Sequence, residues 1–182
     1  MCYNNIMNRE IFDEIVSTYL DKFKLDIKVE YNMPNGYENA FGTFDIEKNA
    51  LYLNAEKLKD APLYKVLFFF FHELHHACEY KYGNSKYLNY VVLYDGTCFK
   101  LKNRKWVGGK LDLKGVDFLE VYKSFPYEIE ANKFAFNETK LFLNSTSDKE
   151  ELEKLFKKML PNDPLSLEKL DEILGKIDEV LG

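Results

Sequence analysis

One segment of the chain, residues 63–82, constrains the fold more than any other. Asp60-Ala61-Pro62 supplies a helix cap and an early proline, Gly83 supplies a helix end, and residues 66–71 between them are entirely apolar. Apolar side chains around most of the circumference are typical of a helix buried in a core. All three histidines of the chain follow directly, within residues 72–76. Because buried imidazoles need polar partners, the sequence predicts a buried polar cluster on this helix.

The composition limits the classes of protein to which the chain can belong. Its 182 residues suit one domain, and a hydrophobic content of 46% suffices for a core without disulfides. The 25 Lys and Arg residues against 30 Asp and Glu give a net charge of −5. This is the wrong sign for a general nucleic-acid binder, so we expect no nucleic-acid partner. The longest apolar run, residues 66–71, is far too short to span a bilayer, so we expect no membrane partner.

The cysteines and the N-terminus indicate the compartment. Cys2, Cys78 and Cys98 are odd in number and far apart, which is typical of free thiols in a reducing environment. Residues 1–5 lack the basic start and the apolar centre of a secretion signal. We therefore expect a cytoplasmic protein.

Apolar periodicity and turn residues divide the chain into an α+β arrangement. Helices are predicted over residues 9–23, with Asn8 as cap, and over residues 63–82, 126–142, 152–160 and 167–181. Strands are predicted over residues 40–46, 51–53, 87–94, 97–102 and 106–113. The segment 87–94 also fits a helix. The polar stretch 144–147 is typical of a joint. We expect one domain over 1–144, with a β-rich insertion at about 86–114, and a C-terminal helical extension over 145–182 that forms a helical hairpin.

The string His72-Glu73-Leu74-His75-His76 carries the chemistry. His72 and His76 are four residues apart, so their imidazoles project from one face of a helix and can bind a single Zn²⁺ ion. Glu73 is displaced by about 100° and can reach a water molecule on that ion as a general base. The alternative is a cluster of histidines that are satisfied by hydrogen bonds and hold no metal.

Other residues near the motif are candidates for supporting roles. His75 could replace His76 as a ligand, but only the His72 and His76 pair places Glu73 correctly, so we assign His75 to packing or to support of the site. No other histidine and only two arginines exist to stabilise an oxyanion, which leaves the metal and tyrosines. The tyrosine candidates are Tyr80, Tyr82, Tyr122 and Tyr127.

A third metal ligand must be a carboxylate, since no histidine remains. Glu128 shares one side of a predicted helix with Ala131 and Ala135, whose small side chains would let that helix approach the histidine helix closely. Glu130 lies on the opposite side. Glu79 shares the face of His72 but lies about two turns away, roughly 10 Å along the axis. Glu128 is therefore the preferred third ligand, with Glu130 and Glu79 as rivals.

Three segments together resemble a known family. Residues 72–76, the hairpin that ends with residues 51–54, and residues 128–135 are similar to the compact gluzincin-type metallopeptidases of the ImmA/IrrE class, found in bacteria and phages. The resemblance covers about residues 40–142. It implies a zincin-like, minimal gluzincin core in which an active-site helix packs on a small twisted sheet. It also implies that His72, His76 and Glu128 bind zinc and that Glu73 acts as base.

The resemblance also implies a kind of partner, and the chain departs from the family at two places. Family members typically cleave a helix-turn-helix transcriptional repressor. Here His75 stands where a small residue is common, and the 51 residues 77–127 separate the two motifs, which leaves room for the insertion.

We therefore expect a zinc-dependent metallopeptidase that hydrolyses a peptide bond in a protein or peptide substrate, with a transcriptional repressor as a candidate. One alternative is a non-catalytic zinc-binding module, in which four protein ligands would close the site. Another is a phage or toxin-type module that binds a protein partner through its C-terminal helices.

Overall fold

The computed structural model describes residues 3–182, with side chains described from Glu10 onward. Helix α1 (Tyr3–Lys22) begins before the expected start at residue 9 and continues through Asn8, so the expected cap at Asn8 is wrong. Its buried side chains, Phe12, Ile15, Val16 and Tyr19, follow the helical spacing of the sequence. Cys78 and Cys98 are free thiols, whereas Cys2 lies outside the described residues.

A small mixed sheet follows α1. Its strands are β1 (Lys28–Glu30), β2 (Gly42–Asp45) and β3 (Ala50–Leu53) in the order β1-β3-β2, with β1 parallel and β2 antiparallel to β3. The predicted β2–β3 hairpin is confirmed. Strand β1 was not predicted, because three residues that alternate between exposed and partly buried give no strand signal. Its pairing with β3 makes β2 and β1 the two edges of the sheet.

Helix α3 (Leu63–Tyr82) is the central element and has the predicted bounds. It is preceded by the short helix α2 (Ala55–Leu58), for which Asn54 is the cap. Residues 67–74 are all buried, and the helix packs on β2 and β3 as well as on helices from the second half of the chain. This continuous burial explains why the segment contains four consecutive phenylalanines.

The expected insertion forms a second, antiparallel sheet. A short 3₁₀ helix (Lys86–Asn89) leads into β4 (Tyr90–Val92), β5 (Thr97–Lys102) and β6 (Lys105–Lys110), in the order β4-β5-β6. The single strand expected over 87–94 is therefore divided between a helical turn and a strand. Asn103 and Arg104 both adopt positive φ values, 51° and 64°, as a tight two-residue hairpin turn requires.

Two helices then bring the chain back to α3. Helix α4 (Phe118–Ser124), which was not predicted, ends just before α5 (Pro126–Leu141). Ala131 and Ala135 are fully buried on α5, and α5 packs against α3 along much of its length. The expectation that the alanine face meets the histidine helix is confirmed.

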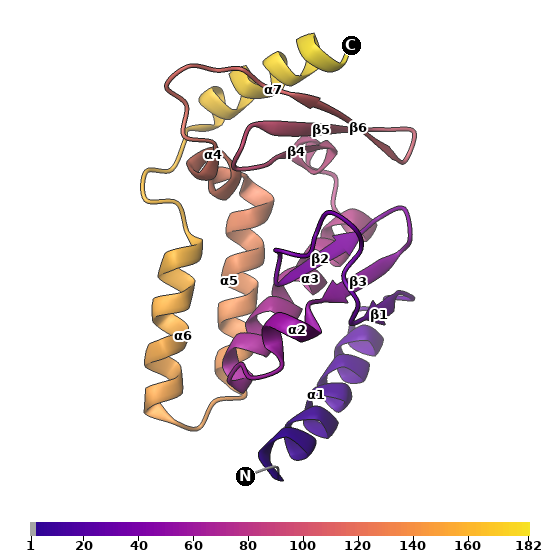
Figure 1. The fold of residues 1–182 in the computed structure, drawn as a ribbon, viewed down its shortest axis with the longest axis vertical. Coiled ribbons are helices and arrows are strands. Elements are labelled where there is room, and N and C mark those ends of the chain that lie inside the picture. Colours follow the sequence, from indigo (N-terminus) through magenta and orange to yellow (C-terminus); the bar gives the residue numbers. More distant parts are fainter. Residues whose placement is uncertain (1–2) are drawn as a thin grey trace.

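The C-terminal helices do not form the expected helical hairpin. Helix α6 (Thr146–Met159) packs on α5 and α3, whereas α7 (Leu167–Leu181) lies across β5 and β6 at the other end of the molecule (Figure 1). Each apolar stripe is buried in a different core. Leu152 of α6 belongs to the cluster that contains α3, and Ile177 of α7 belongs to the cluster of the second sheet. The prediction of a hairpin was wrong because the stripe of α6 and the stripe of α7 are each buried against another part of the molecule and not against one another.

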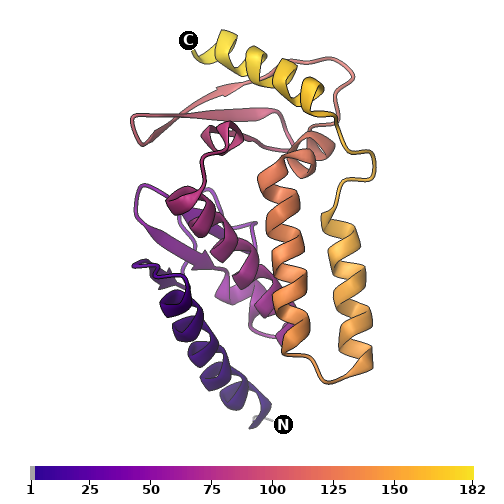
Figure 2. The same cartoon turned by 180° about the vertical axis from the view of Figure 1, so that it is seen from behind.

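The molecule thus contains two hydrophobic clusters. One lies between α1, the first sheet, α3 and α6, and the other lies between the second sheet, α4 and α7. Figure 2 shows α3 and α5 side by side, with the second sheet and α7 beyond the same ends of both helices. The α+β class is confirmed. Within the described residues, no helix combines the length and apolar character needed to cross a membrane.

Candidate metal centre

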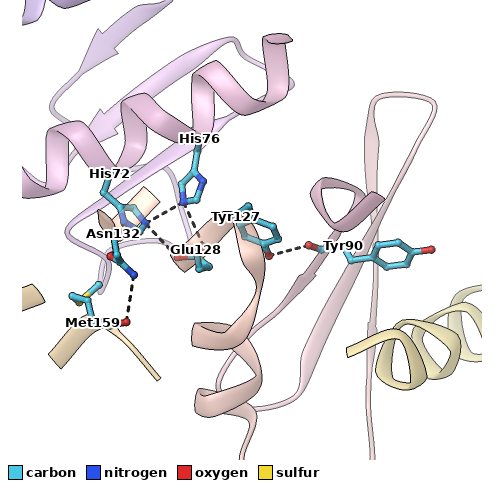
Figure 3. A network of polar contacts seen from close by, with 7 residues as sticks. All are labelled: His72, His76, Tyr90, Tyr127, Glu128, Asn132 and Met159. Atoms are coloured by element: carbon cyan, nitrogen blue, oxygen red, sulfur yellow. Dashed lines mark hydrogen bonds and ion pairs between the residues drawn. The ribbon is translucent and has the colours of Figure 1, made fainter. Parts of the chain in front are cut away.

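His72 and His76 lie one turn apart on α3 and turn their rings toward each other. Their Nε2 atoms are 3.0 Å apart, and the rings are nearly perpendicular at 88° (Figure 3). Both side chains are buried. The spacing alone places them on one face, and the burial of α3 removes them from bulk water.

Glu128 completes a cluster of three. It lies in the first turn of α5, where Pro126 starts the helix. Its Oε2 atom lies 3.3 Å from His72 Nε2, and its Oε1 atom lies 3.4 Å from His76 Nε2. These are the residues among those described whose ligand atoms meet closely enough to hold a metal ion. A tetrahedral ion with bonds of about 2.0–2.1 Å separates its ligand atoms by about 3.3–3.4 Å, so the observed spacings fit one.

Asn132 sets the orientation of His72. Its Oδ1 lies 3.0 Å from His72 Nδ1, and its Nδ2 donates to the backbone carbonyl of Met159 at 3.3 Å (Figure 3). The second bond fixes which end of the amide faces the ring, so Nδ1 carries the proton and Nε2 presents a lone pair to the cluster. Asn132 was not predicted as a site residue, although its position four residues after Glu128 places it on the same helix face.

The cluster needs positive charge. Burial by itself would raise the pKa of Glu128, but His76 and His72 outweigh burial and hold that pKa well below its usual range. Burial would lower the pKa of His72, but Glu128, Glu73 and Asn132 outweigh it and raise that pKa. Glu128 Oε2 is buried without a satisfactory hydrogen bond, although a ring nitrogen lies beside it. A proton on an imidazole or a metal ion would supply the charge.

Glu73 lies next to the cluster without belonging to it. A Cβ atom on Gly42 of β2 would lie 2.7 Å from Glu73 Cγ, so the side chain rests directly against this edge strand. Burial raises the pKa of Glu73. The nearby His72 and His76, and a hydrogen bond with the backbone of Phe44, oppose this rise but do not cancel it. The structure thus places a desolvated carboxylate between the candidate ligand atoms and an edge strand.

The rival ligands do not join the cluster. The Glu130 carboxylate is 59% exposed and pairs with Lys133 at 2.9 Å. The Glu79 carboxylate lies near the end of α3, where a Cβ on Gly83 would be 2.8 Å from its Oε2. Helix geometry therefore turns one of these carboxylates to solvent and places the other too far along α3.

The supporting candidates take different positions. His75 is partly buried against Phe134, with ring centroids 5.3 Å apart, and its Nδ1 has no partner. Tyr127 packs the edge of its ring on His76 at 5.8 Å, but its hydroxyl donates to the carbonyl of Tyr90 at 3.0 Å. Because that hydroxyl is engaged with β4, Tyr127 supports the His76 ring and has no free proton for a ligand.

Tyr80, Tyr82 and Tyr122 are the remaining tyrosine candidates. Tyr80 packs its ring between Phe44 and Trp106, and the Tyr82 hydroxyl donates to the carbonyl of Phe23 on the far side of α3. Tyr122 of α4 is the tyrosine whose hydroxyl is influenced by both Glu128 and Glu73. Burial and the carboxylates of Glu128 and Glu73 raise the pKa of Tyr122 well above its usual value. Tyr122 is therefore a proton donor beside both carboxylates.

Comparisons of the chain with known protein families, with curated proteins and with solved structures find no match. The geometry of the site is therefore the basis for assigning a function. That geometry is a buried set of two imidazoles and one carboxylate that could hold a metal ion, with a second carboxylate and a phenol beside it.

Proposed function

We propose that the protein is a zinc-dependent metallopeptidase. The observation that carries the proposal is the set of contacts between His72, His76 and Glu128, at 3.0, 3.3 and 3.4 Å, with Glu73 adjacent and outside the ligand set. Two imidazoles and one carboxylate form a donor set that suits zinc. Three ligands within the described residues leave one coordination position free, as in hydrolytic zinc sites, whereas structural zinc sites are closed by four.

Each residue has a defined role in this proposal. Zinc, when bound, would supply a Lewis acid that lowers the pKa of water and polarises a carbonyl group. Glu73 takes the proton of the attacking water and delivers it to the leaving amine, because its carboxylate is buried beside the cluster. Tyr122 donates a hydrogen bond to the oxyanion that develops on the carbonyl oxygen. Asn132 keeps His72 in the tautomer that binds metal.

The position of β2 favours a peptide as the substrate. β2 is an edge strand beside α3, and Gly42 brings its backbone against Glu73. An extended peptide can pair with such an edge and so pass next to the base. The resemblance to the ImmA/IrrE class suggests a transcriptional repressor as the protein substrate. The apolar stripes of α6 and α7 are buried inside the molecule, which weighs against a partner surface on those helices.

Metal analysis combined with three variants tests this function. We expect the purified protein to bind about one zinc ion per chain and to cleave denatured proteins. Glu73→Gln should keep the zinc but lose hydrolysis by at least about 100-fold, because only the base is removed. His76→Ala should lose both zinc and hydrolysis. Glu130→Gln, a matched control on the exposed side of α5, should change neither. Cleavage by Glu73→Gln at the wild-type rate would refute the mechanism.

A further inference from the structure

Aromatic rings extend from His76 away from the metal-binding cluster. Tyr80 lies one turn after His76 on α3, which is about 6 Å along the helix axis. Its ring lies 6.0 Å from that of Phe44 on β2 and 6.3 Å from that of Trp106 on β6, measured between centroids. Tyr127 covers the other side of His76. The three rings of Phe44, Tyr80 and Trp106, here called the aromatic wall, thus join the two sheets beside the site.

The strand β6 is held against the β2–β3 hairpin at Trp106. The backbone N–H of Trp106 donates to Glu47 Oε1 at 3.2 Å, and Glu47 lies in the turn between β2 and β3. The edge of the Tyr80 ring meets the Trp106 ring at 84°. These two contacts fix Trp106 above the same edge strand whose Gly42 touches Glu73. The position of Trp106 relative to the base is therefore set by packing on two sides.

Trp106 belongs to an apolar face that neither core uses. In the register of β5 and β6, Trp106 pairs with Leu101 and Gly108 pairs with Phe99, so these side chains share one face of the sheet. The Phe99 ring lies directly over Gly108, where an added Cβ would be 2.8 Å from it. The opposite face, at Gly109, meets Leu181 of α7. Among the described residues, Phe99, Leu101 and Trp106 are partly exposed and lie outside both hydrophobic clusters.

We propose that Trp106 is a specificity-determining residue of this site and that, together with Tyr80, it contacts a large apolar side chain of the substrate. The inference rests on the proposed function and adds a substrate class to it. The substrate is an extended peptide segment with an aromatic or large aliphatic residue within about two residues of the cleaved bond. Tyr80 lies about 6 Å from His76 along α3, and two residues of an extended strand span about 6.6 Å.

The energetic basis of the preference is burial of apolar surface. Covering a Phe or Leu side chain is worth about 1.5–3 kcal/mol, which corresponds to about a 10- to 150-fold preference over alanine. The three side chains of the wall carry no formal charge, so the wall offers no ion-pair partner to a charged residue. The insertion between the two metal-binding motifs, in which Trp106 lies, would thus serve to select the substrate.

Two measurements test the inference. Trp106 is the only tryptophan in the chain, so intrinsic fluorescence reports on it alone. In the zinc-loaded Glu73→Gln protein, a peptide with a central phenylalanine should shift the emission of Trp106 to shorter wavelength in a saturable way. The same peptide with alanine at that position should bind at least about 10-fold more weakly. Equal binding of both peptides, or binding without any change in emission, would overturn the assignment.

Cleavage mapping provides the second measurement. Sites that the wild-type protein cleaves in denatured proteins, located by mass spectrometry, should be enriched in aromatic and large aliphatic residues near the cleaved bond. Trp106→Ala should remove the enrichment, Trp106→Phe should largely retain it, and Val107→Ala, on the opposite face of β6, should not change it. If Trp106→Ala cleaves the same sites as wild type, and this cleavage requires Glu73, the inference is overturned but the proposed function remains supported. Absence of Glu73-dependent cleavage, with the emission shift still present, would instead refute the function and support the contact.

Discussion

Asn132 Oδ1 lies 3.0 Å from His72 Nδ1, and the same amide donates to the carbonyl of Met159 at the end of α6. This relationship links an imidazole of the candidate metal centre to a helix that follows it by more than 70 residues. Both residues are buried, with Asn132 only 1% exposed, so neither bond can be replaced by bulk water. The C-terminal part of the chain therefore contributes to the orientation of His72 in the candidate metal centre.

Replacement of Asn132 should weaken metal binding. Asn132→Ala leaves the His72 ring without its acceptor, so we expect zinc affinity to fall about 10- to 100-fold, as measured by competition with a chromophoric chelator. Asn132→Asp keeps an acceptor and should retain an affinity close to wild type. Lys133→Ala, an exposed neighbour, is the matched control. Equal affinities for Asn132→Ala and wild type would show that the amide has no such role.

Gly42→Ala should separate metal binding from hydrolysis. The new methyl group would lie 2.7 Å from Glu73 Cγ and 3.1 Å from the carbonyl of Tyr52, so either Glu73 or β2 must move. We expect zinc to remain bound while kcat/KM falls at least about 10-fold, because the base is displaced. Gly175→Ala in α7, where a Cβ meets nothing within 4 Å, should leave activity intact and stabilise the protein by about 0.5–1 kcal/mol. Full activity of Gly42→Ala would show that the position of Glu73 is not constrained by β2.

His75 should make the metal-free protein less stable in acid. Burial lowers the pKa of His75 to about 4, and the neighbouring His76 and His72 add to this effect. The unfolded chain binds the proton with its ordinary pKa near 6.5, so it takes up more protons than the folded chain between about pH 6.5 and 4. Stability therefore falls as the pH decreases through this range. Because the side chain is partly exposed, we expect the contribution of His75 to be about 1–2 kcal/mol.

Denaturant unfolding in EDTA at pH 7 and pH 4 measures this contribution. Wild type and His75→Gln share every other titratable group, so comparison of the two isolates the effect of His75. The variant should lose less stability between the two pH values than wild type. An identical loss would mean that the ring accepts its proton without penalty in the folded state.

Truncation of buried leucines should show that α6 belongs to the main core. Leu152 is fully buried, so Leu152→Ala should reduce the free energy of unfolding by about 2–5 kcal/mol. Val180→Ala, at a position 51% exposed on α7, should change it by less than about 0.5 kcal/mol. A small effect of Leu152→Ala would instead indicate that α6 contributes little to the main core. Urea denaturation followed by circular dichroism distinguishes the two results.

Local signals predicted much of the fold. The bounds of α3 were correct because a proline start, a glycine end and a long apolar segment agree with one another. The β2–β3 hairpin was correct for a similar reason. Strand β1 and helix α4 were missed, since β1 has three residues and is stabilised by pairing with β3, while α4 has seven. The arrangement of α6 and α7 was also wrong, because an apolar stripe does not specify which surface will cover it.

The sequence by itself determined that His72 and His76 share a face and that Glu73 lies beside them, because these relations follow from the pitch of one helix. It favoured Glu128 over Glu130 and Glu79 as the third candidate ligand. Only the tertiary structure showed that Glu128 meets the two imidazoles, because the 51 residues between His76 and Glu128 are placed by the packing of α5 on α3. The same packing brought Asn132 to His72 and Trp106 to Tyr80, which are contacts between residues distant in sequence that no local spacing encodes.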